Sequence, residues 1–285
     1  MSKLSNSWNI MKSSATVLRL DPELMVFPLL SGIATILVTA TFIVPFAVIG
    51  GGFGALEEMG ENPGYLGYVV GFLYYVVLYS LIFFFNTALV GATMIRLEGG
   101  DPTVGDGLNI AFKKMSAILQ YAVIAATVGM FLRALEERAG FIGRIVIGLV
   151  GLSWTLATYL TVPVLVVKDV GAIDAVKESA DLFKKTWGEQ VAGNVGISLL
   201  TFLLMVAMDL VAVPLIILTS SISEALLIPL LISFGGGFLF LILLSSSLNG
   251  IYTAALYRFA TTGDPGAHFD AAMMESAFKP KKRRW

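Results

Sequence analysis

Six long apolar runs constrain the fold of this chain more than any other feature. A helix needs about 20 apolar residues to cross the hydrocarbon core of a bilayer, and a backbone placed there must satisfy its own hydrogen bonds, as a helix does. We therefore predict an all-α, polytopic membrane protein with six transmembrane helices. The runs cover residues 25–49, 65–95, 117–133, 145–167, 191–218 and 225–257.

Composition agrees with this class and argues against several kinds of active site. Charged residues make up only 14% of the chain, whereas soluble proteins carry about 25%. Cysteine is absent and His268 is the single histidine, which disfavours disulfides, thiolate chemistry and histidine-based metal sites. We find no paired carboxylates, nucleophile–base set or phosphate loop. We therefore expect a protein that is not an enzyme and has no metal, cofactor or nucleic-acid partner.

The distribution of lysine and arginine predicts the orientation of the spans. Of the 19 basic residues, 16 fall before, between or after the runs on one side. The other side holds only Arg133, Arg138 and Arg144. Because basic residues concentrate on the cytoplasmic side, both termini are predicted to be cytoplasmic. The first 24 residues are mixed polar, unlike a signal peptide, so the first run is expected to be a retained anchor.

Four polar segments on the basic side have apolar residues at helical spacing, which predicts amphipathic helices lying in the membrane interface. In the clearest, residues 171–190, the spacing is kept by Ile173, Val176, Ala180, Phe183 and Trp187. Similar stripes precede the first and third runs and follow the sixth. From these stripes we expect five residues to anchor the helices in the interface: Trp8, Phe112, Phe183, Trp187 and Phe278.

Sequence similarity between two short segments suggests an internal repeat. The segment "NTALVGATMIRLEGGDP" from Asn86 aligns without a gap with "NGIYTAALYRFATTGDP" from Asn249. We interpret 1–285 as a single membrane domain of three hairpins, each preceded by a cytoplasmic amphipathic helix, with a fourth such helix at the end. The alternative is that amphipathic connectors merely join the spans of a multi-pass protein. The repeat units would be 1–99, 100–170 and 171–263, followed by a basic tail, 264–285.

A few polar residues within the runs are candidates for function. Asp209 would lie close to the outer boundary if its span begins near residue 191, where an ion pair with Arg133 or Arg144 could hold it; proton or cation binding is the alternative. Asn86 and Asn249 place amides in the second and sixth runs. We expect these amides to form hydrogen bonds between helices, although they could instead line a polar cavity.

Three segments resemble a prokaryotic multi-pass membrane family that is catalogued as a domain of unknown function. They are "SWNIMKSS…LDPELMVFPLLSGI" near the start, "TVPVLVVKDVGAIDAVKESADLFKKTWGE" in the middle and "TAALYRFATTGDP" near the end. The resemblance implies a six-span protein of the prokaryotic cytoplasmic membrane. It implies no activity and no site residues.

The functional expectation is a non-enzymatic membrane protein that organises membrane lipid or protein partners through its cytoplasmic helices. A homo-oligomer or a membrane-protein partner is compatible with this interpretation. The alternative is a channel or transporter for a small solute or ion, using Asp209 and the polar positions of spans two and six. An enzyme acting on lipids is the weakest of the three hypotheses, because no acid–base pair is evident.

Overall fold

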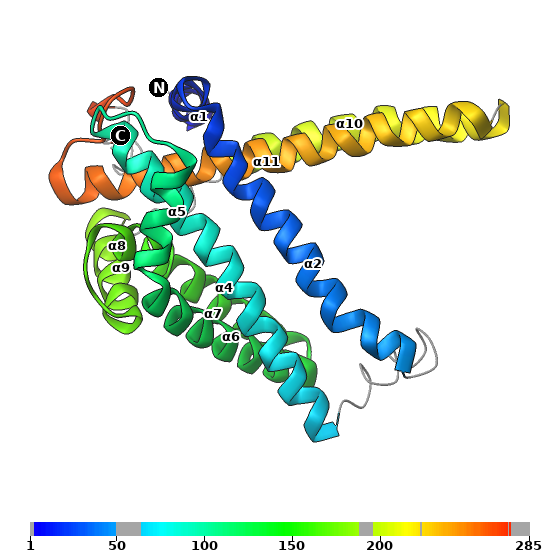
Figure 1. Cartoon of the computed structure of the whole chain (residues 1–285), viewed down its shortest axis with the longest axis horizontal. Coiled ribbons are helices and arrows are strands. Elements are labelled where there is room, and N and C mark those ends of the chain that lie inside the picture. The colour runs from blue at the N-terminus through cyan, green and yellow to red at the C-terminus, as the bar shows by residue number, and fades with distance from the viewer. Residues whose placement is uncertain (1–2, 50–63, 188–195, 223, 273, 275–285) are drawn as a thin grey trace, which may run out of the picture. The chain divides into compact units, whose positions relative to one another are not determined.

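The computed structural model describes residues 3–49, 64–187, 196–222, 224–272 and 274, and the regular elements in these residues are all helices (Figure 1). The predicted all-α class is therefore confirmed, as is the presence of six helical segments apolar enough to span a membrane. These candidate spans are Pro22–Pro45, Gly64–Leu97, Met115–Arg138, Phe141–Val167, Leu200–Ser220 and Leu226–Thr262.

Ten α-helices and one short 3-10 helix follow one another in these residues. In chain order they are α1 (Lys3–Leu20), η1 (Pro22–Met25), α2 (Val26–Ile49), α4 (Gly64–Leu97), α5 (Val104–Lys113), α6 (Met115–Arg138), α7 (Phe141–Ala157), α8 (Thr161–Val167), α9 (Ala172–Trp187), α10 (Gly196–Ile222) and α11 (Glu224–Thr262).

The chain divides into two compact units that interleave along the sequence. Unit 1 contains Met1–Met25, Thr93–Asp101 and Trp187–Trp285, and unit 2 contains Val26–Ala92 and Pro102–Thr186. The end of α4 thus groups with α1, α10 and α11, while the rest of α4 groups with α2 and α5 to α9. The single membrane domain and the three repeat units predicted from the sequence stay predictions.

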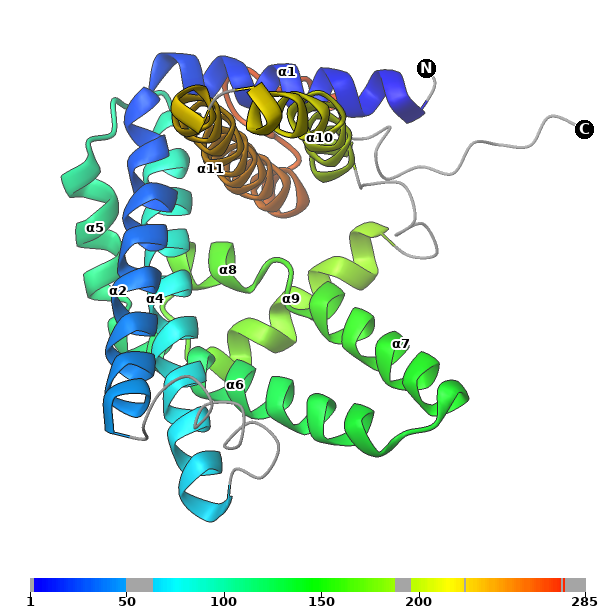
Figure 2. The ribbon, with the colours of Figure 1, turned by 90° about the vertical axis from the view of Figure 1, so that its right-hand side faces the viewer.

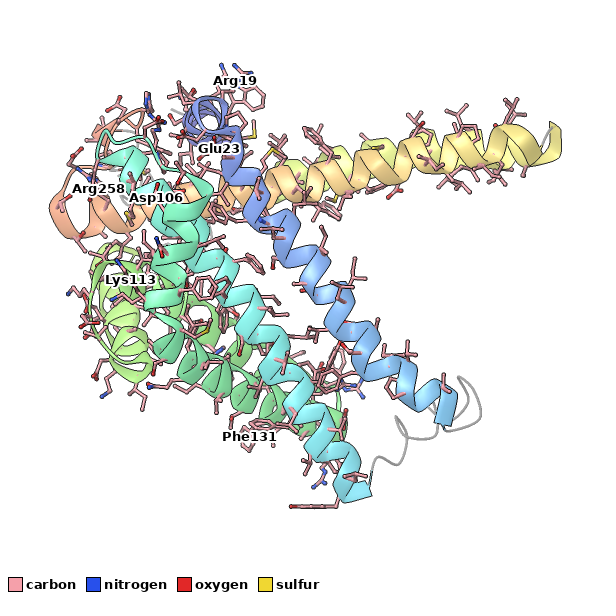
Figure 3. All side chains as sticks on the ribbon, in the orientation of Figure 1. Arg19, Glu23, Asp106, Lys113, Phe131 and Arg258 are labelled. Carbon is pink, nitrogen blue, oxygen red and sulfur yellow. The ribbon has the colours of Figure 1, made fainter. Side chains whose placement is uncertain are left out.

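Unit 1 is built on the pairing of α10 with α11, and α1 contacts both helices (Figure 2). The pair approaches closely at Gly237, where a Cβ atom would lie 3.2 Å from the sulfur of Met208. The other faces of both helices carry exposed large apolar side chains, which project along their length in Figure 3. An apolar surface of this kind is what a helix pair in lipid presents to acyl chains.

Unit 2 is held together by an aromatic series that joins three helices. Phe42 of α2 contacts Tyr74 of α4 at 5.2 Å between ring centroids, and Phe83 of α4 stacks on Tyr121 of α6 at 4.3 Å. The Tyr74 hydroxyl also lies 3.1 Å from the hydroxyl of Thr39 on α2. Such ring pairs stabilise packing by about 0.5–1.5 kcal/mol beyond their buried area.

The fourth candidate span is broken, although the sequence predicted one uninterrupted run over 145–167. It consists of α7 and α8, separated by a turn at residues 158–160. Pro163 gives the physical reason, because its ring cannot donate a backbone hydrogen bond and clashes with the carbonyl four residues earlier. The Thr161 N–H accordingly donates to the carbonyl of Thr158, at 3.0 Å, in a tighter turn.

The docking of α5 onto α2 and α4 depends on a glycine. A Cβ at Gly107 would lie 2.5 Å from Phe27 Cζ and 2.6 Å from the carbonyl oxygen of Ala88. We predict that Gly107→Ala lowers the free energy of unfolding by about 1–3 kcal/mol through overpacking. Gly105→Ala on the same helix is the matched control, because a Cβ there meets only Thr103 Oγ1, at 3.5 Å. Thermal unfolding in detergent compares the two variants, and equal midpoints would contradict this packing.

Candidate functional site

The amphipathic helix α9 has a buried face that the apolar stripe in the sequence did not reveal. Ala172, Ala175 and Ser179 are fully buried. Ile173, on the adjacent face, is 61% exposed, and Val176 is half-buried. A third face carries exposed charged residues, among them Asp174, Lys177, Asp181 and Lys184. The helix therefore has a small-residue face towards the protein, a larger apolar face beside it and a charged face.

Helix α1 also buries one face, but the residues on that face are mostly large and apolar. Its buried residues include Ile10, Ser14 and Val17, and α1 contacts α10 and α11. Trp8, one of the predicted interfacial anchors, is 47% exposed and has the ammonium group of Lys12 at 5.6 Å from its ring. This is a cation–π contact at an exposed site.

Helix α5, like α9, buries small residues on one face and exposes a large apolar side chain on another. Gly107 and Ala111 are buried. The predicted anchor Phe112 is 61% exposed, and the edge of its ring contacts Phe84 at 4.9 Å. The next residue, Lys113, is also exposed (Figure 3).

In all three helices the predicted apolar stripe neighbours the buried face but does not form most of it. One residue corresponds to about 100° around a helix, so a buried stripe one position earlier faces a different direction. Alanine, glycine and serine let two backbones approach closely, which explains why they occupy the buried faces of α5 and α9. Larger apolar side chains then remain at the surface, where acyl chains can cover them.

A hydroxyl and three charged groups fix α9 and the adjoining loop in unit 2. Ser179 Oγ, in the buried face, accepts the backbone N–H of Leu160 at 2.9 Å. Lys168 pairs with Glu178 of α9. Lys114 donates to the carbonyl of Lys168 at 2.8 Å, just before α9 begins. The buried hydrogen bond contributes most to position, because the charged groups are partly exposed.

Helix α5 begins at a complete capping box. The backbone N–H of Asp106 donates to Thr103 Oγ1 at 3.2 Å, and the carboxylate of Asp106 accepts from the Thr103 backbone N–H at 2.9 Å. The Thr103 hydroxyl also donates to this carboxylate. These bonds, the hydroxyl first, lower the pKa of Asp106 below its ordinary value. The box satisfies two backbone donors that every helix start leaves open.

A second feature of unit 1 is a charged cluster where three helices begin or end. We call it the arginine–aspartate junction, and it comprises Asp21, Arg96, Glu98, Asp101, Arg258 and Asp264. Arg96, at the end of α4, forms a bidentate pair with Asp21, between α1 and η1. The same guanidinium also donates to Asp101. The side chain of Asp21 is only 5% exposed, whereas that of Asp101 is 92% exposed.

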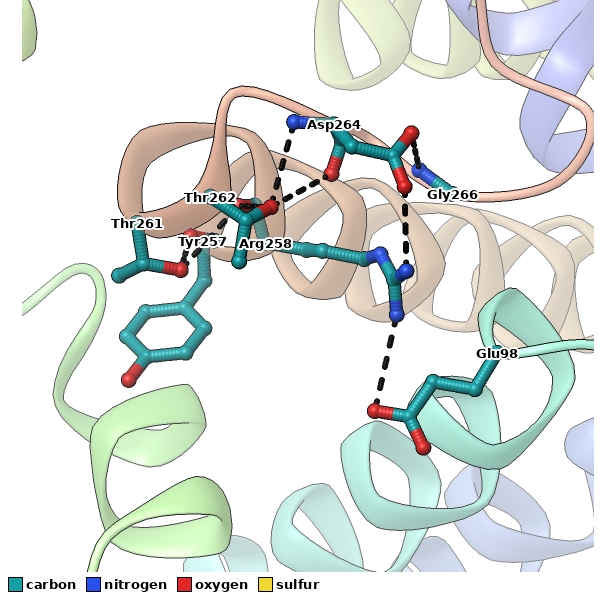
Figure 4. Close-up of polar contacts among 7 residues, drawn as sticks. All are labelled: Glu98, Tyr257, Arg258, Thr261, Thr262, Asp264 and Gly266. Carbon is teal, nitrogen blue, oxygen red and sulfur yellow. Dashed lines mark hydrogen bonds and ion pairs between the residues drawn. The ribbon is translucent and has the colours of Figure 1, made fainter.

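Arg258 organises the other half of the junction, at the end of α11 (Figure 4). It donates to Asp264 at 3.1 Å and lies 3.6 Å from the carboxylate of Glu98. Asp264 also accepts the backbone N–H of Gly266 at 3.0 Å. This bond first, and then Arg258, lowers the pKa of the Asp264 carboxyl below its ordinary value.

Gly266 allows the segment after α11 to approach the end of α4. Its φ of +88° lies in the left-handed region, and a Cβ there would be 2.8 Å from the carbonyl oxygen of Leu97. That carbonyl accepts the N–H of Ala267 at 3.2 Å. The junction thus joins the ends of α4 and α11 through backbone as well as through charge.

The ends of α4 and α11 share a local turn. Each helix is followed by a glycine with positive φ, Gly99 and Gly263, as is common at helix C-termini. Each glycine precedes an Asp-Pro dipeptide, and in each case the aspartate pairs with the arginine of the helix that has just ended. The shared turn lies in the two segments aligned from the sequence, while the three-unit repeat stays a prediction.

The chemistry of the junction indicates a structural role, in which ion pairs hold the helix ends together. Its two guanidinium groups are surrounded by four carboxylates, so it offers no unpaired cation to an anionic ligand. No group of three or more histidine, aspartate or glutamate side chains placed to hold a metal occurs in the residues that the structure describes. Sequence reasoning missed this cluster. The available signal was the set of three Asp-Pro dipeptides, at Asp21, Asp101 and Asp264, each following an arginine within six residues.

Asp209 lies in the described part of α10. This residue is the fourteenth of the 27 residues of α10, and it lies nine residues into the candidate span Leu200–Ser220. Its depth in the membrane stays a prediction. Its side chain is exposed.

The cations proposed to pair with Asp209 both lie in unit 2. Arg133 donates to Glu137 at 3.1 Å and to the Tyr75 hydroxyl at 3.0 Å. Arg144 is exposed near the start of α7. An ion pair between either arginine and Asp209 stays a prediction.

The two asparagines differ in their surroundings. Asn249 donates from Nδ2 to the carbonyl of Ser245, one turn earlier in α11, at 2.9 Å. Asn86 is half-buried on α4. The two residues belong to different units, and a shared site stays a prediction.

The three other predicted anchors differ in their positions. Phe183 is 9% exposed and so belongs to the buried face of α9. Trp187 is the last residue of α9, and Phe278 lies outside the described residues. The interfacial role of all five anchors stays a prediction.

Comparison with known proteins identifies a family. The model of a family of unknown function, DUF6159, matches residues 65–267, and the chain therefore belongs to this family. This confirms the resemblance carried by the middle and C-terminal motifs, while the N-terminal motif lies before the matched residues. No curated protein and no solved structure matches the chain.

The junction offers a matched pair of substitutions. Asp21 and Asp101 both pair with Arg96, but only Asp21 is buried. We predict that Asp21→Asn lowers the free energy of unfolding by about 3–5 kcal/mol, because it leaves a partly buried guanidinium without its main counter-charge. Asp101→Asn should cost about 0–1 kcal/mol, as for an exposed pair. Denaturant unfolding in mixed micelles measures both values, and equal losses would contradict the assigned geometry.

Proposed function

We propose that this chain is a non-enzymatic integral protein of the prokaryotic cytoplasmic membrane that organises anionic lipid at the inner leaflet. Lipid would bind α5 and α9 in unit 2 and, separately, α1 in unit 1. The observation that carries this proposal is that each helix buries one face in the protein and leaves large apolar side chains exposed on another. Trp8, Phe112 and Ile173, at 47%, 61% and 61% exposed, represent the three surfaces.

Exposed apolar stripes next to exposed lysines match the physical chemistry of an interfacial helix. Acyl chains would cover the stripe, while anionic headgroups would lie near the charged face. Each lysine close to an anionic leaflet contributes about 1 kcal/mol to membrane attraction. Lys113 on α5 is exposed and comes directly after the exposed Phe112, and Lys184 on α9 is also exposed.

The proposed topology places these helices on the cytoplasmic side. Three hairpins would cross the membrane, each preceded by one of the helices, and both termini would be cytoplasmic. The support is the concentration of basic residues in the same connecting segments. A protein partner or a second copy of the chain could also occupy the exposed stripes, and the lipid experiment below separates these occupants.

A channel or transporter is the alternative, and Asp209 is the observation that favours it. A carboxylate in the middle of an apolar helix is costly in lipid and often marks an ion or proton pathway. Against this alternative, the Asn249 amide donates to its own helix, as expected for a group that does not line a polar pathway. Lipid organisation therefore accounts for more of the molecule.

Lipid retention in native membrane discs tests the proposal. We predict that discs extracted with the wild-type protein are enriched in anionic lipid relative to the bulk membrane. Lys113→Gln combined with Lys184→Gln should remove most of this enrichment, since two charges at about 1 kcal/mol each correspond to about 30-fold in affinity. Lipid mass spectrometry of the purified discs gives the measurement.

Arg138→Gln combined with Arg144→Gln is the matched control for the lysine variant. It removes the same charge from two exposed residues that are predicted to lie on the opposite side of the membrane. Equal enrichment in wild-type, lysine-variant and arginine-variant discs would refute lipid organisation by α5 and α9. Loss of a stoichiometric protein from the lysine variant alone, with unchanged lipid, would assign the surface to a protein partner.

A further inference from the structure

A single carboxylate interrupts the apolar surface of the α10–α11 pair, whose two helices run side by side (Figures 1 and 2). Asp209 is the one charged residue of α10, and its side chain is exposed. The preceding residue, Met208, packs on Gly237 of α11. Because one residue corresponds to about 100° around a helix, Asp209 faces away from α11, towards the surface of unit 1.

An exposed apolar stripe surrounds this carboxylate. Phe202, Val206 and Val213 lie at helical spacing from Asp209, so they share its side of the helix. Their side chains are 60%, 37% and 51% exposed. No hydrogen bond or ion pair involves the Asp209 carboxylate among the residues that the structure describes. Ionisable residues of membrane helices almost always face protein and pair with another group, so a covering surface with a partner for Asp209 is missing from unit 1.

A cation that pairs with Asp209 is best supplied from the middle of a span, because Asp209 lies nine residues into Leu200–Ser220 and its side chain is short. In the six candidate spans that the structure describes, lysine is absent and each arginine lies within five residues of a span end. These arginines are Arg96, Arg133, Arg138, Arg144 and Arg258. Neither these spans nor those of a second copy of the chain therefore offer a central cation.

The chemistry of the stripe favours a basic side chain over a metal ion. One carboxylate on an apolar stripe supplies at most two oxygen ligands, whereas Mg²⁺ and Ca²⁺ take about six or more. A lysine or arginine of a neighbouring helix needs only the one carboxylate, and polar contacts of this kind join helices in membranes. Charge complementarity thus indicates a basic transmembrane helix.

We propose that the stripe formed by Phe202, Val206, Asp209 and Val213 binds a transmembrane helix of another membrane protein, one that carries a lysine or arginine in the middle of its span. The basic side chain pairs with Asp209, and the apolar side chains pack around the pair and exclude lipid from it. This assigns Asp209 to protein binding and not to an ion pathway. The proposal stands independently of lipid organisation by α1, α5 and α9.

Binding of synthetic transmembrane peptides to the full-length protein tests the proposal. The peptides are leucine–alanine helices with either lysine or leucine at the centre, and the protein is reconstituted in neutral phosphatidylcholine vesicles. Energy transfer is measured between a dye on the peptide and a dye on Ser220→Cys, an exposed position at the end of the span. We expect the central-lysine peptide to bind about tenfold more tightly than the central-leucine peptide, which corresponds to about 1.4 kcal/mol. Asp209→Asn should remove this difference.

Two further variants sharpen the experiment. Glu224→Gln removes the other carboxylate of α10 and α11, which lies outside the candidate spans, and should leave the preference for the lysine peptide unchanged. Asp209→Lys should reverse the preference, so that this variant binds a central-aspartate peptide and not the central-lysine peptide.

Equal binding of the lysine and leucine peptides to protein with the native Asp209 would overturn the proposal, as when Arg133 or Arg144 of the same chain already pairs with this carboxylate. Undiminished binding of the lysine peptide to folded Asp209→Asn would also overturn it. If a variant does not fold, the comparison of the two peptides on protein with the native Asp209 still decides the question.

Discussion

A backbone N–H or C=O that enters hydrocarbon must find a partner within the protein, and the architecture of this chain depends on that constraint. It accounts for the helical spans, and it also explains how the chain is satisfied where the span from Phe141 to Val167 is broken. At residues 158–160 the chain leaves the helix, and Ser179 of a different helix satisfies the N–H of Leu160. A helix that looks solvated in the sequence thus completes the hydrogen bonding of a membrane helix.

The same contact links structure to the proposed function. If α9 lay on the lipid surface by its apolar stripe alone, its position would vary with the membrane. Its small-residue face is instead buried, and the pair formed by Lys168 and Glu178 adds a second attachment. In unit 1, α1 is buried in a comparable way against α10 and α11. Within each unit, a helix that is fixed in this way and leaves apolar side chains exposed would present a defined surface to lipid, as proposed.

The sequence predicted the helices well, but it did not predict which of their residues are buried in the protein, for a physical reason. Periodicity identifies large apolar residues, so Ile173 and Phe112 marked a stripe, while Ala175 and Gly107 carried little signal although both are buried. Hydropathy also could not show that Pro163 divides a span, because membrane helices often accommodate proline. The arginine–aspartate junction was missed because its pairs join residues such as Asp21 and Arg96, which are 75 positions apart. In the sequence, the junction was indicated only by the Asp-Pro dipeptides.

The central claim is that α5 and α9 lie at the same, cytoplasmic face of the membrane, each held by its small-residue face. Cysteine accessibility tests it most directly, because the natural chain contains no cysteine. Cysteines introduced at Lys113 and Lys184 should both resist a membrane-impermeant maleimide in intact cells and react after permeabilisation, whereas one at Arg138 should react in intact cells. Labelling of Lys113→Cys and Lys184→Cys from opposite sides of the membrane would contradict the account.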